Sequence, residues 1–318
     1  MSVLYRFRAR LLLCVAALAA LGALAFAPAA GANNVGNTYL ALGDSLAYGY
    51  HQAQFNEELK AKGYVEPATF NDGYVNDFGA ALKLFNPKLQ IINDGCPGET
   101  TETMIKGSGV YGPNYCAGGP TGGPFPKAFL HHPYAGTQLA DALAVAANPD
   151  VRTITLDIGA NDLKQFLEHT CGFPATFTCS PGQIEAEFGH IATNVGVILA
   201  QLRAVAPKAK IVFVSQYNPY PTVLQPEGTG DATTEALNGA LKGVATTFGA
   251  SFANTTKAIN YSGTHGGPEA GDIRTVCAFT AMCPGGKFNP SSPEADIHPT
   301  KLGYAVMAGV VGAAYLSH

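Results

Sequence analysis

Short apolar runs that alternate with helical patterns constrain the fold of this 318-residue chain more than any other feature. Four runs rich in β-branched residues cover residues 37–42, 89–92, 151–158 and 210–215, and a fifth, shorter one covers 250–254. Helical patterns fall between and after them, at about 73–84, 136–147, 181–204, 231–248 and 300–315. Alternation of this kind predicts parallel strands with helices on both faces. We therefore expect a three-layer α/β/α sandwich with a flavodoxin-like parallel sheet of about five strands.

The first 32 residues have the layout of a secretory signal peptide. Three arginines precede an apolar run over 11–27, and small residues follow up to Ala32. We expect cleavage after Ala32, export of the protein, and a single domain over residues 33–318. The competing interpretation is an uncleaved membrane anchor, since few polar residues interrupt the apolar run.

The charge of the chain excludes some partners. Its formal net charge is −4, and loss of the three N-terminal arginines takes it to about −7. An acidic chain is a poor match for nucleic acid or for an anionic membrane surface, so we expect neither as a stable partner. Stretches rich in glycine, proline and aromatic residues at 106–132, 217–230 and 260–295 predict loops around one end of the sheet. The sequence does not set the oligomeric state.

Six cysteines follow the predicted cleavage site, an even number that favours disulfides in an oxidising compartment. Spacing does not fix connectivity, but we favour pairing in sequence order. These pairs are Cys96–Cys116, Cys171–Cys179 and Cys277–Cys283. A zinc site is the alternative, although no Cys-x-x-Cys or paired Cys/His spacing occurs.

Four short polar segments lie where predicted strands end or where the last helix begins. They are Gly43-Asp44-Ser45-Leu46, Asn93-Asp94-Gly95-Cys96-Pro97-Gly98-Glu99-Thr100-Thr101, Gly159-Ala160-Asn161-Asp162 and Asp296-Ile297-His298-Pro299. Ligands of open α/β sheets bind outside the carboxyl ends of the strands, so we expect these segments to meet there. A serine hydroxyl becomes a nucleophile when a base takes its proton, and histidine is well suited to do so. Ser45 and His298 are therefore the candidate nucleophile and base.

This ordered set of segments resembles the GDSL or SGNH hydrolases, a family of serine esterases, lipases and carbohydrate deacetylases. The resemblance spans nearly all of the chain after residue 32. It implies that the oxyanion of the reaction is bound by the backbone N–H groups of Ser45 and Gly98 and by the side-chain amide of Asn161. It implies no metal or organic cofactor.

The third member of the catalytic triad departs from the family pattern. The family usually has an aspartate three residues before the histidine, where this chain has Ala295. Asp296 lies two residues before His298, and Glu294 lies four before. Three alternatives stay open: Asp296 reaches the imidazole through an altered turn, a backbone carbonyl such as that of Ala295 orients it in a Ser-His dyad, or a more distant acid does.

Structural roles compete with the functional ones at several of these positions. Gly98 could serve a turn that needs a positive φ, and Asn161 could cap the segment that follows it. We interpret Asp44 and Asp162 as residues that fix turns rather than as catalytic groups. His131 and its neighbour His132 lie in a long predicted loop and could contact substrate.

The sequence thus predicts an exported serine hydrolase that cleaves carboxylic esters, of a lipid or a small alcohol. A carbohydrate O-deacetylase with the same site is the alternative within this class. A catalytically idle cell-envelope protein that binds a glycan or lipid is the alternative outside it. The chain has neither the Gly-x-Ser-x-Gly elbow of α/β-hydrolases nor the His-Glu-x-x-His pattern of zinc hydrolases.

Overall fold

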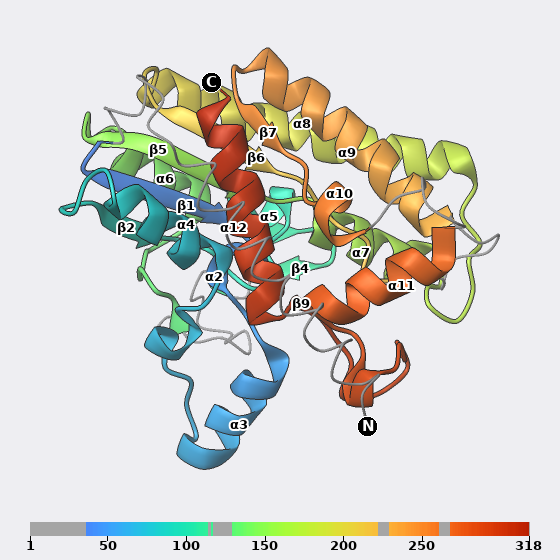
Figure 1. Ribbon diagram of the computed structural model, residues 1–318. Coiled ribbons are helices and arrows are strands. Elements are labelled where there is room, and N and C mark those ends of the chain that lie inside the picture. Colours follow the sequence, from blue (N-terminus) through green and yellow to red (C-terminus); the bar gives the residue numbers. More distant parts are fainter. Residues whose placement is uncertain (1–35, 114–115, 117–128, 222–228, 261–267, 318) are drawn as a thin grey trace. The chain divides into compact units, whose positions relative to one another are not determined.

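A computed structural model describes residues 36–113, 116, 129–221, 229–260 and 268–317 (Figure 1). Within these residues the central sheet has five parallel strands in the order β2-β1-β5-β6-β7. The strands are β1 (Thr38–Gly43), β2 (Gln90–Asn93), β5 (Val151–Asp157), β6 (Lys210–Val214) and β7 (Ser251–Ala253). When these five strands are numbered by their position in the sequence, their order across the sheet is 2-1-3-4-5, the order of flavodoxin-like folds. The predicted fold class is confirmed.

Successive side chains of a strand point to opposite faces of the sheet, so each face has its own apolar side chains. A different set of helices covers each face. Leu40 and Leu42 of β1 point to one face, and Tyr39 and Ala41 to the other. The first face packs against α5 (Thr101–Lys106), α6 (Gln138–Ala146), α7 (Ala160–Thr170), α8 (Pro181–Val205) and α9 (Thr229–Thr247). The second face packs against α4 (Tyr74–Lys83), α10 (Thr256–Ile259) and α12 (Lys301–Leu316). The result is the expected three-layer sandwich.

The remaining described elements lie outside these three layers. They are α2 (Ser45–Tyr48), α3 (Gln52–Lys62), the 3-10 helix Pro67–Phe70, β3 (Ser108–Gly109), β4 (Gly112–Pro113), α11 (Pro268–Phe279), β8 (Thr280–Ala281), the 3-10 helix Pro284–Gly286 and β9 (Asp296–Pro299). β3 pairs with β4, and β8 with β9, both antiparallel. Contacts between α2 and β9 bring the start and the end of the domain together.

Among the described helices of more than ten residues, three were not predicted. Helices α3 and α7 lie where we expected none, and α11 lies within the stretch 260–295 that we interpreted as a loop. Helix α3 buries only Phe55 and Glu58, so it has too few apolar side chains for a helical period to reveal it.

The six cysteines of the domain form the three disulfides that were favoured from the sequence. Cys96 pairs with Cys116, and the two shorter loops close between residues 171 and 179 and between residues 277 and 283. The alternative that these cysteines form a zinc site is therefore wrong. Disulfides of this kind persist in oxidising compartments.

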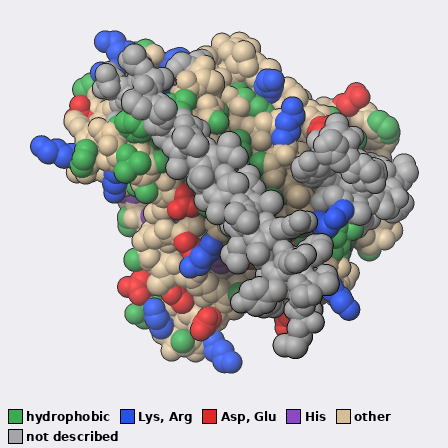
Figure 2. Space-filling view, viewed as in Figure 1, with side chains coloured by type: hydrophobic (Ala, Val, Ile, Leu, Met, Phe, Trp, Pro, Cys, Tyr) green, Lys and Arg blue, Asp and Glu red, His purple; other side chains and the backbone are tan. Residues whose placement is uncertain are grey.

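Acidic and basic side chains are interspersed on the face of the molecule drawn in Figure 2. Among the helices that the structure describes, none is both long enough and apolar enough to cross a bilayer. The predicted signal peptide, residues 1–32, lies outside the described residues.

Candidate active site

Ser45 stands at the first position of α2, immediately after the turn that ends β1. Gly43 has a φ of +140°, and a Cβ at this position would lie 2.1 Å from both the carbonyl oxygen and Oδ1 of Asp157, so only glycine fits. Asp44 caps α2, because its Oδ1 accepts a hydrogen bond of 2.9 Å from the N–H of Leu46. This turn leaves the Ser45 side chain at the carboxyl end of the sheet, in a residue that is 8% exposed.

Two buried side chains that the sequence argument did not single out contact this turn. The amide of Gln138 accepts from the N–H of Gly43 at 2.7 Å and donates to its carbonyl at 2.9 Å. Oδ1 of Asp157 accepts from the N–H of Asp44 at 2.9 Å, and its Oδ2 accepts from the hydroxyl of Tyr74 at 2.5 Å. An acid at the end of a strand that was predicted to be buried was the signal that could have identified Asp157.

The carboxyls of Asp44 and Asp157 are both buried and share one site. Burial, followed by the nearby charge of Asp44, raises the pKa of Asp157 well above its ordinary value. Burial also raises the pKa of Asp44 to about 6, although hydrogen bonds to Leu46 and Asp157 and the charge of His298 act in the opposite direction. Two like charges are unfavourable in such a place, so Asp157 is the neutral partner.

Ser45, His298 and Asp296 form one chain of hydrogen bonds. Nε2 of His298 lies 2.8 Å from Oγ of Ser45, and Nδ1 lies 2.5 Å from Oδ1 of Asp296. Oδ2 of Asp296 accepts a hydrogen bond of 2.8 Å from the N–H of Gln52. A carboxylate at Nδ1 favours the tautomer with its proton there, which leaves Nε2 free to accept the serine proton.

The group that contacts Nδ1 of His298 is thus the side chain of Asp296, rather than the carbonyl of Ala295 or a distant acid. Both residues belong to β9, where side chains two positions apart point to the same face. Burial alone would raise the pKa of Asp296, but its contact with His298 and the hydrogen bonds that it accepts outweigh burial and lower it. Asp296 is therefore the ionised partner of the imidazole.

The three expected oxyanion donors lie on three different segments. Gly98 has a φ of +82°, in agreement with the turn role that competes with its functional one. Among the described residues, the N–H groups of Ser45 and Gly98 have no hydrogen-bond acceptor. Nδ2 of Asn161 donates to the carbonyl of Glu99 at 3.0 Å and, at the longer distance of 3.2 Å, to Oδ2 of Asp44. An oxyanion would therefore compete with Asp44 for the second amide hydrogen.

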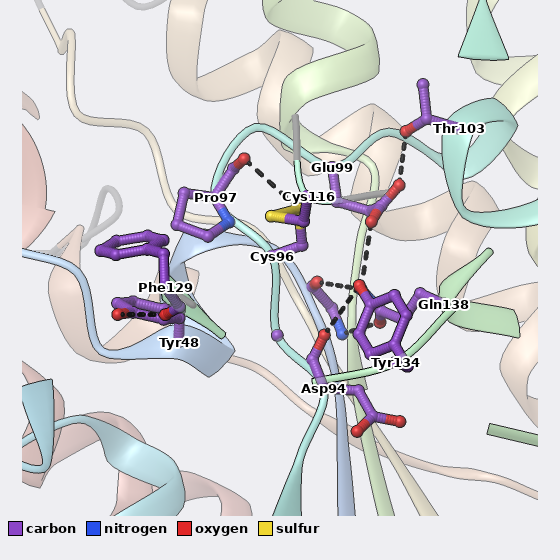
Figure 3. The surroundings of a disulfide bond; sticks show 12 residues. Tyr48, Asp94, Cys96, Pro97, Glu99, Thr103, Cys116, Phe129, Tyr134 and Gln138 are labelled. Carbon is purple, nitrogen blue, oxygen red and sulfur yellow. Dashed lines mark hydrogen bonds between the residues drawn. A yellow bond between two sulfur atoms is a disulfide. The ribbon is translucent and has the colours of Figure 1, made fainter. Parts of the chain in front are cut away.

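Side chains from other segments position the loop after β2, which contains Gly98. Asp162, at the start of α7, accepts from the N–H and the hydroxyl of Thr101. Glu99 accepts from the hydroxyl of Thr103 at 2.5 Å and from the amide of Gln138 at 3.2 Å, as Figure 3 shows. The turn-fixing role that we expected for Asp162 agrees with these contacts.

Two tyrosines beside His298 were also missed from the sequence. The hydroxyl of Tyr217 donates to the carbonyl of Ile297 at 2.5 Å. The ring of Tyr50 lies edge-on to the imidazole of His298, with the two ring centroids 4.7 Å apart. Neither belongs to a segment that matched a motif. The two loop histidines, in contrast, have structural contacts. Nε2 of His131 lies 2.9 Å from the carbonyl oxygen of Tyr48, and His132 contacts Asp94 and Asp141.

A pocket of about 110 Å³ lies beside the catalytic segment of β9. Ile297, between Asp296 and His298, is one of its walls, and Asn161 is another. Much of the remaining lining is apolar and comes from α7, α9 and the loops between them. It includes Leu163, Leu167, Phe173 and Leu237.

Known proteins resemble this chain in sequence pattern and in fold. The sequence matches the GDSL-like Lipase/Acylhydrolase family over residues 41–306. The structure resembles a lipase from a goat rumen metagenome at 18% identity, with 87% of this chain and 96% of that one covered and a TM-score of 0.50. This likeness supports the fold.

Two further solved structures are similar to the chain. A phospholipase A1 from Streptomyces albidoflavus NA297 has 16% identity over 84% of this chain and 94% of that one, with a TM-score of 0.49. An acetylxylan esterase from Geobacillus stearothermophilus has 15% identity over 87% and 94%, with a TM-score of 0.45. No curated protein matches the sequence. The family match covers most of the chain, so this protein belongs to the GDSL-like lipase/acylhydrolase family and is a carboxylic ester hydrolase.

Proposed function

We propose that the protein is an exported esterase that works through a Ser45–His298–Asp296 triad. The observation that carries the proposal is the unbroken chain of hydrogen bonds from Oγ of Ser45 to the carboxylate of Asp296. A nucleophile, a base and a group that orients the base are the three parts that acyl transfer by a serine requires.

In the proposed reaction, Oγ of Ser45 attacks the ester carbonyl while Nε2 of His298 takes the hydroxyl proton. Asp296 stabilises the imidazolium without taking up a proton itself. The tetrahedral oxyanion accepts hydrogen bonds from the N–H groups of Ser45 and Gly98 and from Nδ2 of Asn161. His298 then gives its proton to the leaving alcohol, and the acyl group stays on Ser45.

Deacylation repeats these roles with water as the nucleophile. His298 takes a proton from the water as the water attacks the acyl carbon. It then returns the proton to Oγ of Ser45 as the bond between Oγ and the acyl carbon breaks and the carboxylic acid leaves. The nucleophile of the first step, the base and the oxyanion donors all belong to the chain itself.

The substrate that we propose is an ester with an apolar acyl chain, of a lipid or a small alcohol. The apolar pocket beside Ile297 supports this class, because burial of a methylene in such a pocket is favourable by about 0.8 kcal/mol. A carbohydrate O-deacetylase would use the same triad but would hydrolyse only acetyl esters.

The test is hydrolysis of p-nitrophenyl acetate, butyrate and palmitate by the mature chain and by Ser45→Ala. Ser108→Ala is the matched control, because Ser108 is exposed at the start of the β3–β4 hairpin. We expect turnover in the wild type and in the control and none in Ser45→Ala, with butyrate preferred over acetate. A preference for acetate alone would favour the deacetylase. Equal rates in all three proteins would contradict Ser45 as the nucleophile and favour the idle binding protein.

We further propose that residues 1–32 are removed during export and that residues 33–318 form the mature hydrolase. The arginines, the apolar run and the small residues before residue 33 support this boundary. The three disulfides of the domain support an extracellular destination. Intact mass and N-terminal sequencing of protein from the culture medium should give Asn33 as the first residue, and a chain that begins at Met1 would contradict cleavage.

A further inference from the structure

Three side chains with metal-binding chemistry meet at the start of the loop that contains Gly98. Asp94 follows the end of β2, His132 lies in the loop before α6, and Asp141 lies in the first turn of α6. Nδ1 of His132 is 2.7 Å from Oδ1 of Asp94 and 3.4 Å from Oδ2 of Asp141. One donor atom from each residue lies within 4.8 Å of the other two. None of the three takes part in the proposed acyl transfer.

Oxygen atoms of this cluster are buried without a hydrogen-bond partner. Asp94 is fully buried, and its Oδ2 has no hydrogen-bond partner among the described residues. The same is true of Oδ2 of Asp141, which faces the histidine only at an ion-pair distance. Burying an unsatisfied carboxylate oxygen is costly, and natural proteins compensate for it with a paired charge or a metal ion.

Two acids face one histidine here. When both carboxylates are ionised, the single positive charge of a protonated imidazole leaves the cluster with a net negative charge. A divalent cation among the three side chains would neutralise both carboxylates and remove this repulsion.

We propose that Asp94, His132 and Asp141 bind a divalent transition-metal ion, with Zn²⁺ as the reference ion. Zinc prefers nitrogen and oxygen ligands in small numbers, and one imidazole with two carboxylates is such a set. Calcium prefers six to eight oxygen ligands, which this site lacks. Binding would release the proton from Nδ1 of His132 and leave Nε2 protonated, and water would complete the coordination.

The expected consequence of this metal is stability rather than chemistry. Asp94 begins the segment that leads through Cys96 to Gly98, and Figure 3 shows Asp94 on the same loop as the disulfide. Ligation would join this loop to α6, much as the disulfide joins it to residue 116. Binding to the folded state alone raises the melting temperature in proportion to the logarithm of the metal concentration.

The test measures metal binding directly, so it does not depend on the proposed esterase activity. Mature protein is stripped with a chelator, dialysed against ZnCl₂ in slight molar excess and then against zinc-free buffer, and its zinc content and melting temperature are measured. We expect one zinc per chain and a rise in melting temperature. His132→Gln and Asp141→Asn should each lose both effects. His190→Gln is the control, because His190 is a half-exposed histidine of α8 beside Glu187.

The chelated variants separate a metal site from a simple ion pair. If the cluster binds metal, chelated Asp141→Asn should be at least as stable as the chelated wild type, because one of two repelling carboxylates is gone. An ion pair of protonated His132 predicts a less stable Asp141→Asn and no zinc in any variant. The proposal would be overturned if the wild type bound no zinc, or if the wild type and His132→Gln bound equal amounts. It would also be overturned if CaCl₂ raised the melting temperature as much as ZnCl₂ does.

Discussion

Asp296→Asn is the change that tests the triad most directly. The carboxylate accepts from Nδ1 of His298 through Oδ1 and from the N–H of Gln52 through Oδ2. Of the two backbone hydrogen bonds to this carboxylate, the one from Gln52 is shorter, at 2.8 Å against 3.2 Å for the N–H of His298, so the amide oxygen of an asparagine would turn toward Gln52. The NH₂ group would then face His298 and donate to Nδ1. Nε2 would carry the ring proton, and it could no longer accept the proton of Ser45.

The size of the effect follows from the charge that develops on His298. A carboxylate and an imidazolium about 4 Å apart attract by about 4 kcal/mol at an effective dielectric constant of about 20. Loss of this attraction alone lowers kcat about 10³-fold. The wrong tautomer adds to it, and the same substitution in the chymotrypsin-type triad lowers kcat about 10⁴-fold. We therefore expect a loss of 10³- to 10⁴-fold in kcat, with KM little changed.

The assay is the initial rate of p-nitrophenyl butyrate hydrolysis, with the melting temperature of each variant as the check on folding. Asp72→Asn is the matched control, because Asp72 also contacts a histidine, His51 at 3.1 Å, but has no serine beyond it. We expect near-normal turnover in the control. A kcat for Asp296→Asn within about tenfold of the wild type would refute the reasoning, since Asp296 would then not set the tautomer of His298.

Three further predictions follow from other contacts. Asn161→Ala should lower kcat about 10²- to 10³-fold through loss of one oxyanion donor, and unchanged steady-state rates would remove Asn161 from that role. The raised pKa of Asp157 means that the folded protein keeps a proton that the unfolded chain releases, so the contribution of this acid to stability falls as pH rises above 3.8. Asp157→Asn lacks this titration, so its melting temperature relative to the wild type should increase toward neutral pH; a constant difference would contradict the raised pKa. Replacement of Cys96 and Cys116 by serine opens a loop of 20 residues and should cost about 3 kcal/mol of unfolding free energy in urea titrations, whereas a loss below about 1 kcal/mol would show that the folded loop constrains the chain without the bond.

The five strands and the long helices were predictable because each is apolar on the side that faces the core. β1 is largely apolar, β5 is rich in β-branched and apolar residues, and α8 has apolar residues at helical spacing over its whole length. Helix α7 was missed although Leu163, Phe166 and Leu167 recur at helical spacing and pack against the core, because its polar first turn was interpreted as a motif segment alone. Local patterns identify helices by what they bury, and α7 begins with polar residues that have other contacts.

The site was predictable as a set of segments but not as a geometry. Sequence pattern brought Ser45 and His298 together, yet it left three candidates for the group at Nδ1 of the histidine. The choice depends on β9, where an extended backbone puts Asp296 and His298 on one face. β9 is short and pairs with β8 rather than with the main sheet, so no period in the sequence indicates it.

The residues that no motif indicated have one property in common, which is that they join segments distant in sequence. Gln138 of α6 contacts both Gly43 after β1 and Glu99 after β2, and the N–H of Gln52 reaches Asp296 near the end of the chain. Each polar group in this network has its partner on another segment, so burial is favourable only when all segments are in place. The distance between Ser45 and His298 therefore depends on the folding of the whole domain, and single-sequence reasoning can name the reacting groups without naming the side chains that align them.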